Sequence, residues 1–231
     1  MWVSVGIYDP HCAPGASPLS MPTIMVGMYY IQAPMIAGLQ LHTAPATEPL
    51  TVAEVKARLR ITISDEDSDL AALLAECREL CERECQRAFI TQTWTLYLDD
   101  FPRGGDLTIY IPRPPLISVT HLKYYDVDGV QQTYGASNYH VAAGGEPGRI
   151  VRVDGGVWPA IDSGRPESVE VRFVCGYGAA GAVPAAAKNA ILVVMASLRE
   201  NPGSEDNKSA RAGIPAAARR ALDSLEYGEI R

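Results

Sequence analysis

Cationic side chains are scarce at the start of the chain and never gather into a basic block. The first lysine or arginine is Lys56, and the 20 Lys and Arg are outnumbered by 27 Asp and Glu, which gives a net charge of −7 at pH 7. Sequence-specific binding of nucleic acid needs clustered cations that neutralise phosphates. Secretory and transit leaders also need positive charge. We therefore expect neither sequence-specific DNA binding nor secretion.

Cysteine and histidine are few and scattered. Three of the five cysteines fall at i, i+4 and i+8 of an expected helix, without the C-x-x-C spacing or nearby histidine of a metal site, which favours small buried hydrophobic side chains and free thiols in a reducing compartment. No nucleophile motif surrounds the histidines. The sequence predicts no enzyme, cofactor or metal. The residues concerned are Cys12, Cys77, Cys81, Cys85, Cys175, His11, His42, His121 and His140.

A long uninterrupted hydrophobic run is also missing. Residues 21–41 are uncharged, but prolines and glycines such as Pro22, Gly27 and Pro34 interrupt them. This favours an extended N-terminal arm over residues 1–48 rather than a membrane span; a later start at one of the methionines is an alternative. The arm has no evident core, so its aromatic side chains are predicted to bury against a neighbouring subunit or partner, the alternative being a floppy tail. These aromatic residues are Trp2, Tyr8, Tyr29 and Tyr30.

The first clear elements of the chain are two helices in residues 49–92. Thr51 and Glu54 have the spacing of a capping box, which predicts a helix that ends near Arg60. Ser64 is expected to cap a second helix over residues 65–87. Asp65, Asp67, Asp69 and Glu76 match four positions of a calcium loop, but Leu70 replaces its turn glycine, so a solvated helix start is the better interpretation.

From Thr91 the apolar period changes to two, which predicts short antiparallel strands over residues 93–175. Asp128 and Gly129 predict a type I′ hairpin turn. Pro184 then opens a helix within residues 176–203 that is apolar almost all round and is expected to be central and buried. A linker and a last helix from Ile214 to about Tyr227 occupy residues 204–231. The fold class predicted is α+β: a helical bundle with an inserted antiparallel β domain.

Residues 176–181 read G-x-G-x-x-G, as in dinucleotide-binding sites. The preceding strands are expected to be antiparallel, the helix begins about three residues late, and no strand with a terminal acidic residue follows. A flexible strand-to-helix turn is therefore favoured over a nucleotide site.

Several blocks of sequence, in this order and at this spacing, resemble the head-tail connector (adaptor) family of tailed phages, in particular its longer branch with a β insertion. The blocks are LTVAEVKARLR from Leu50, ITQTW from Ile90, IPRPPL from Ile111, Val119-Thr120, KYYD from Lys123, EPGRI from Glu146, and Val183-Pro184 with Lys188. The resemblance covers residues 50 to about 202, with a looser match to the end. Residues 1–48 have no counterpart in it.

The resemblance implies a structural virion protein in the neck, made in the host cytoplasm, in a phage or a related particle such as a gene transfer agent. It implies a ring of about twelve subunits, closed by head-to-tail contacts, that binds the portal protein and offers a docking face to tail stopper or terminator proteins. Residues 65–87 would lie near the DNA channel. The portal-binding segment would be residues 214–231, with Ile214, Pro215, Leu222, Leu225, Tyr227, Ile230 and Arg231 as its contact residues.

An acidic protein suits such a channel, because a wall that repels phosphates lets DNA slide without specific binding. The partners expected are thus copies of the chain, portal and tail proteins and passing DNA, with no membrane. An alternative from another class is a β-domain binding module for a host glycan or a capsid decoration site. A virion-associated hydrolase is a third and weaker hypothesis.

Overall fold

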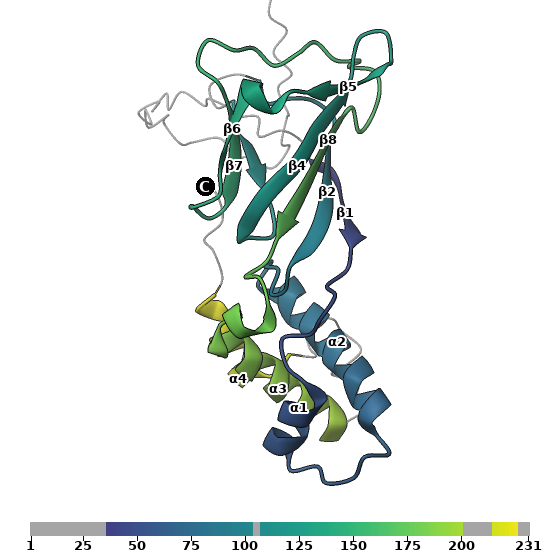
Figure 1. The fold of residues 1–231 in the computed structure, drawn as a ribbon, viewed down its shortest axis with the longest axis vertical. Coiled ribbons are helices and arrows are strands. Elements are labelled where there is room, and N and C mark those ends of the chain that lie inside the picture. Colours follow the sequence, from purple (N-terminus) through teal and green to yellow (C-terminus); the bar gives the residue numbers. More distant parts are fainter. Residues whose placement is uncertain (1–35, 104–106, 201–213, 226–231) are drawn as a thin grey trace, which may run out of the picture. The chain divides into compact units, whose positions relative to one another are not determined.

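The computed structural model describes residues 36–103, 107–200 and 214–225, which belong to one compact unit. Over these residues the chain is α+β, with four α-helices and antiparallel strands, as predicted; the strands form two sheets (Figure 1). The elements in order are β1 (Ile36–Thr43), α1 (Val52–Leu59), α2 (Asp67–Glu84), β2 (Gln92–Leu98), β3 (Ile109–Ile111), β4 (Leu116–Tyr125), β5 (Gln131–Tyr134), η1 (Ala136–Asn138), β6 (Tyr139–Ala142), β7 (Gly148–Arg152), β8 (Val169–Cys175), η2 (Ala180–Ala182), α3 (Ala185–Glu200) and α4 (Ala216–Asp223).

Helix α1 begins as its sequence predicts. The Thr51 hydroxyl accepts the Glu54 amide at 3.2 Å, while the Glu54 carboxylate accepts the Thr51 amide at 2.7 Å. The two residues thus satisfy each other's free amides. Arg60, with φ of 57°, ends the helix in the left-handed region.

Helix α2 is shorter than predicted at both ends. The predicted Ser64 cap is wrong. The residue before the helix is Glu66, which makes no side-chain cap. Ser64 lies one turn earlier, where its backbone carbonyl accepts the Asp67 amide. At the other end Gln86 has φ of 54°, which a continuing helix cannot use, so α2 stops at Glu84 rather than at residue 87.

Residues 36–43, which fall in the predicted arm, form a strand of the protein's own sheet. β1 pairs antiparallel with β2, and the five-stranded order is β1-β2-β8-β4-β5, so β1 is an edge strand. The second sheet has the order β3-β7-β6. The arm itself remains a prediction for residues 1–35, which lie outside the described residues. No helix in the described ranges is long and apolar enough to cross a membrane.

The β4–β5 hairpin differs from the predicted type I′ turn. Gly129 has φ of 75°, but Asp128 does not have the positive φ that type I′ requires. The Gly129 amide binds the Asp126 carbonyl and the Asp126 amide binds the Val130 carbonyl, which closes a three-residue loop. The Asp126 carboxylate also accepts the amides of Asp128 and Val130. The turn is therefore type I followed by a left-handed glycine, a common three-residue hairpin.

The buried apolar side chains form two clusters. One is built from the four helices and includes Leu74, Ile191, Met195 and Leu222. The other fills the space between strands of both sheets and includes Phe173 and other strand residues. Helix α3 contributes one face to the first cluster, with Ala187, Ala190, Ile191, Val194 and Met195 buried. Leu192, Val193 and Leu198 are only partly buried, so the helix is less covered than the central, buried helix predicted.

Candidate interaction surfaces

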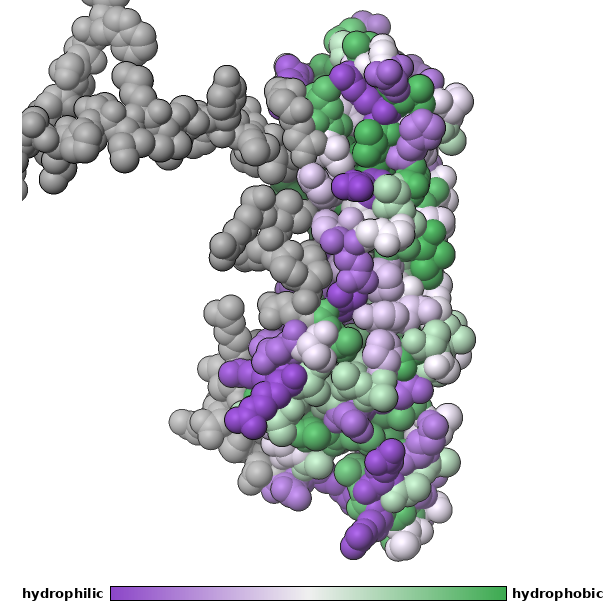
Figure 2. All heavy atoms as spheres, turned by 90° about the vertical axis from the view of Figure 1, so that its left-hand side faces the viewer, coloured by the Kyte–Doolittle hydropathy of each residue, from purple (hydrophilic) through white to green (hydrophobic). Residues whose placement is uncertain are grey.

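A groove of about 480 Å³ lies between α1, α3 and α4. Its floor is made of small and aliphatic side chains, and Arg58 stands at its rim. Figure 2 views this side of the molecule and shows hydrophobic side chains gathered over the helices, with hydrophilic ones at the margins. The lining residues are Arg58, Leu59, Asn189, Ala190, Leu192, Val193, Ala196, Ala217 and Ala221.

The solvent-facing side of α2 carries a stripe of exposed, mainly acidic residues. Spacings of three and four residues bring them onto one helix face. We call this the acidic stripe; it consists of Asp69, Ala72, Glu76, Glu79 and Arg83. The opposite face of α2 contributes Leu70, Leu74, Cys77 and Cys81 to the helical cluster. The stripe thus faces away from the protein's own core.

A buried ion pair joins the end of α2 to the segment that enters β2. The Glu82 carboxylate, in a residue that is 4% exposed, accepts Arg78 Nη1 at 2.6 Å, the Phe89 amide at 2.6 Å and Gln92 Nε2 at 3.0 Å. Arg78 Nε also binds Glu48 Oε2 at 2.8 Å. These bonds tie the helical cluster to β2 of the five-stranded sheet.

Charge and burial oppose each other in this pair. Burial raises the pKa of Glu82, although the Phe89 amide and Arg78 act to lower it. Burial acts to lower the pKa of Arg78, but Glu82 and Glu48 outweigh it and the pKa is raised. The geometry favours the charged pair, because all three contacts of Glu82 are donors and none accepts its proton.

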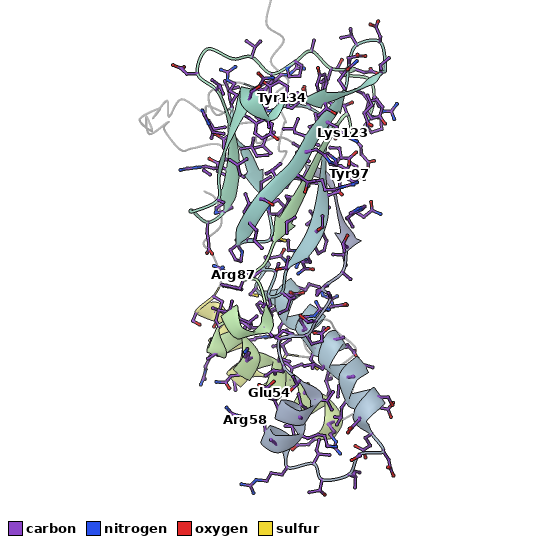
Figure 3. The ribbon with its side chains drawn as sticks, viewed as in Figure 1. Glu54, Arg58, Arg87, Tyr97, Lys123 and Tyr134 are labelled. Atoms are coloured by element: carbon purple, nitrogen blue, oxygen red, sulfur yellow. The ribbon has the colours of Figure 1, made fainter. Side chains whose placement is uncertain are left out.

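A second polar contact links the end of α2, the second sheet and the end of α4. Arg87 Nη1 donates to Glu146 Oε1 at 2.8 Å and to the Tyr177 hydroxyl at 3.0 Å, and Arg87 Nε donates to the Leu225 carbonyl. Figure 3 shows Arg87 between the helices and the strands. Burial acts to lower the pKa of Arg87, but Glu146 and Tyr177 outweigh it and the pKa is raised. The Arg87 side chain therefore contacts the end of the last described segment at Leu225.

The aromatic side chains near the β4–β5 hairpin mostly pack on each other. Phe101 stacks on Trp158 with centroids 4.8 Å apart, and Tyr134 lies 5.4 Å from the same indole. Phe101 and Tyr139 are buried. The exposed apolar residues here are valines: Val127, Val130 and Val157, the last 74% exposed. The rings are thus used for folding rather than displayed.

The cysteines considered as possible metal ligands in the sequence lie in the protein's core. Cys77, Cys81, Cys85 and Cys175 are buried, as the helical spacing predicts for the first three. Burial raises the pKa of Cys77 to about 12 and that of Cys85 to about 11. The described residues hold no cluster of three or more His, Cys, Asp or Glu side chains that could bind a metal ion.

The remaining motifs are also structural. His121 Nε2 lies 3.0 Å from Glu170 Oε1 across neighbouring strands. The glycine-rich motif is a strand-to-helix turn, as predicted: Gly176 and Gly178 have φ of 119° and 111°. A Cβ on Gly176 would lie 2.4 Å from the Ile90 carbonyl oxygen, so glycine is required there for close approach of two backbones.

The structure describes four of the predicted portal-binding residues, and they differ in exposure. Ile214 and Leu222 are buried in the helical cluster, while Pro215 and Leu225 are half-buried. In this conformation Ile214 and Leu222 serve the subunit's own core. Tyr227, Ile230 and Arg231, like the arm residues Trp2, Tyr8, Tyr29 and Tyr30, lie outside the described residues. Their predicted contacts stay predictions.

The sequence does not predict the groove or the acidic stripe. The available signal for the groove is the all-round apolar character of α3, but that pattern predicts burial inside the subunit, because a sequence does not show how many neighbours a helix has.

No family model matches the chain, and no similar protein is found among curated proteins. Solved structures with the same fold do exist. A chain in the neck of an empty gene transfer agent (GTA) particle, computed with C6 symmetry, is 22% identical with a TM-score of 0.66; the match covers 84% of this chain and 97% of that one. A chain in the virion of a native GTA particle is 23% identical with the same TM-score and coverage.

A third chain, from the neck of a native GTA particle computed with C12 symmetry, is 24% identical over 80% of this chain and 94% of that one, with a TM-score of 0.61. The sequence identities are low, but the match covers nearly the whole of each of those chains. The comparison therefore shows a common fold. The protein therefore has the fold of chains found in GTA particles, two of them in the neck.

Proposed function

We propose that the protein is a structural virion component of a particle neck, a head-tail connector (adaptor) subunit that forms a ring between portal and tail. The observation that carries the proposal is the match over 84% of this chain and 97% of a chain in a GTA neck.

Ring formation is supported by the symmetry of the related particles. The neck structures with similar chains were computed with C6 and C12 symmetry. A ring of about twelve subunits uses one repeated head-to-tail interface, in which two different patches of each copy meet. We propose that the four helices, which share one core, form the bundle that builds this ring.

The portal contact is proposed for the end of the chain. Because Ile214 and Leu222 are buried in the subunit's own core, we propose that Tyr227, Ile230 and Arg231 supply the contacts to the portal. The opposite face of the ring would receive tail stopper or terminator proteins. DNA would pass through the channel without being gripped, which the net charge of −7 favours.

The test is assembly with and without a portal protein from the same particle. Mass photometry and negative-stain images should show closed rings of the full chain, and a complex of higher mass when portal is added. Deleting residues 226–231 should leave the rings and remove the portal complex. Monomers alone, even with portal present, would contradict the proposal.

A glycan-binding module is less well supported. Carbohydrate platforms use exposed aromatic faces, whereas Phe101 and Tyr139 near the hairpin are buried and Trp158 stacks on Phe101. A glycan array is the direct comparison, and the connector should score nothing on it.

A further inference from the structure

Helix α3 presents more apolar surface than its own subunit covers. Its sequence, AAAKNAILVVMASLRE, is apolar almost all round, and such a helix is normally buried on every side. Yet Leu192 and Val193 are only partly buried and line the groove between α1, α3 and α4. The uncovered face is continuous with alanines of α4, so another helix can approach closely there.

The rim of this groove is positively charged. Arg58 lines the groove from α1, and Figure 3 shows it pointing outward from that helix. Arg220 is exposed on α4, one residue from the lining residue Ala221. Within the described ranges neither arginine makes an ion pair, in contrast to Lys56 and Arg199, which pair with Asp67 and Glu66. The groove is therefore apolar at its floor and cationic at its edge.

The acidic stripe of α2 has the complementary character. Asp69 and Glu76 make no ion pair with other described residues, and Glu79 is only loosely paired with Arg78 at 3.4 Å. Ala72 lies between Asp69 and Glu76, so this part of the stripe has little side-chain bulk. Figure 1 shows α2 on one side of the helical layer and α4 on the other. Groove and stripe are different patches, so they cannot meet within one copy.

We propose that the occupant of the groove is a second copy of the chain, whose acidic stripe on α2 packs between α1, α3 and α4. The contact would cover Leu192 and Val193, set Arg58 and Arg220 against Asp69, Glu76 and Glu79, and let the helix axes approach to about 8–10 Å over the alanines. Because the two patches differ, the contact is head-to-tail and repeats into a ring.

This inference rests on the proposed ring and specifies its subunit interface. It assigns the middle of α2 to the neighbouring subunit rather than to the DNA channel. The interface combines an apolar floor with opposite charges at the rim, so assembly should weaken with rising salt.

The test is a charge swap in the full chain, with ring mass measured by mass photometry over a dilution series. Arg58→Glu and Glu76→Arg alone should each weaken assembly by about tenfold or more, because each sets like charges against each other. The double variant should recover to within about threefold of wild type, since every interface again holds one charge of each sign. Arg149→Glu on β7, exposed and away from both patches, is the matched control and should leave assembly unchanged.

A second variant tests the apolar floor. Ala217 is exposed in the groove, so Ala217→Trp should fold, as circular dichroism will check, but block the neighbour's helix, while Ala217→Ser should assemble normally. If Ala217→Trp and both single charge variants form rings as readily as the wild type does, this interface is overturned and the connector proposal still stands. A wild-type protein that stays monomeric with portal present would overturn both.

Discussion

Removing the charge of the buried Glu82 alone is expected to destabilise this fold by several kilocalories per mole, because Arg78 is then left without its main partner. In Glu82→Gln the remaining carbonyl oxygen can still accept the Phe89 amide and Gln92 Nε2. The new amide nitrogen, however, replaces the oxygen that lies 2.6 Å from Arg78 Nη1, so a donor faces a donor. Arg78 then keeps Glu48 as its main anionic partner.

The magnitude follows from the cost of leaving a buried charge without its partner, about 3–5 kcal/mol. Because Glu48 still binds Arg78 Nε at 2.8 Å, we expect the lower end of this range. We therefore predict that Glu82→Gln lowers the free energy of unfolding by about 3 kcal/mol. The double variant Arg78→Met/Glu82→Gln, which removes the stranded cation, should lose only about 1–2 kcal/mol.

Urea titration followed by far-ultraviolet circular dichroism and by tryptophan fluorescence measures this change. The first signal reports the helices, and the second reports Trp94 and Trp158 in the strand region together with Trp2. Coincidence of the two curves justifies a single free energy. Glu79→Gln is the matched control: its side chain is 64% exposed, so a change within about 0.5 kcal/mol is expected. A free energy for Glu82→Gln that equals that of the control would refute the ion-pair argument.

Three further predictions concern single positions. Burial shields the thiols of Cys77, Cys81, Cys85 and Cys175 and raises their pKa values. In native Cys12→Ser protein at pH 8 these four thiols should therefore not react with a thiol reagent, whereas all four should react in denaturant. Reaction in the native protein would contradict their burial. Gly176→Ala should destabilise the protein by about 3 kcal/mol or more, because its Cβ would meet the Ile90 carbonyl at 2.4 Å; Gly144→Ala, with nothing within 4 Å, should be tolerated in the same urea titration. Gln132 and the amides of the hairpin turn lower the pKa of Asp126 from 3.8, so its stabilising effect should be present above pH 3.8 and be lost as the pH falls through the lowered value; an NMR titration midpoint at or above 3.8 would contradict this.

Local signals in the sequence were sufficient where the interaction is local. The capping box of α1 joins Thr51 and Glu54, three residues apart, and forms as predicted. The Ser64 cap failed although its residue type was suitable, because the chain makes an additional turn before α2 begins. The hairpin was predicted at the right place with the wrong turn type, because loop length depends on strand register, which Asp128 and Gly129 do not set alone.

Long-range pairing could not be predicted in the same way. β1 is an uncharged segment whose partner β2 lies about fifty residues further along, so nothing adjacent in sequence distinguishes a strand from an arm. Likewise, α3 was correctly expected to be a helix, but its apolar surface does not indicate which part is covered by its own subunit. The groove beside Leu192 follows from how α1 and α4 happen to pack on it.

By itself the sequence determined the order of helices, strands and helices from residue 50 onward, the buried helical thiols, the absence of a basic block and the resemblance to a neck connector, because these depend on residue type and short-range spacing. Only the tertiary structure decided that β1 closes one edge of the sheet, that Glu82 joins α2 to the segment before β2, that Ile214 and Leu222 are buried, and that a cationic apolar groove and an acidic stripe lie on different sides of the helices. Those features depend on contacts between residues far apart in the chain, which are set by packing and burial rather than by local conformational preference.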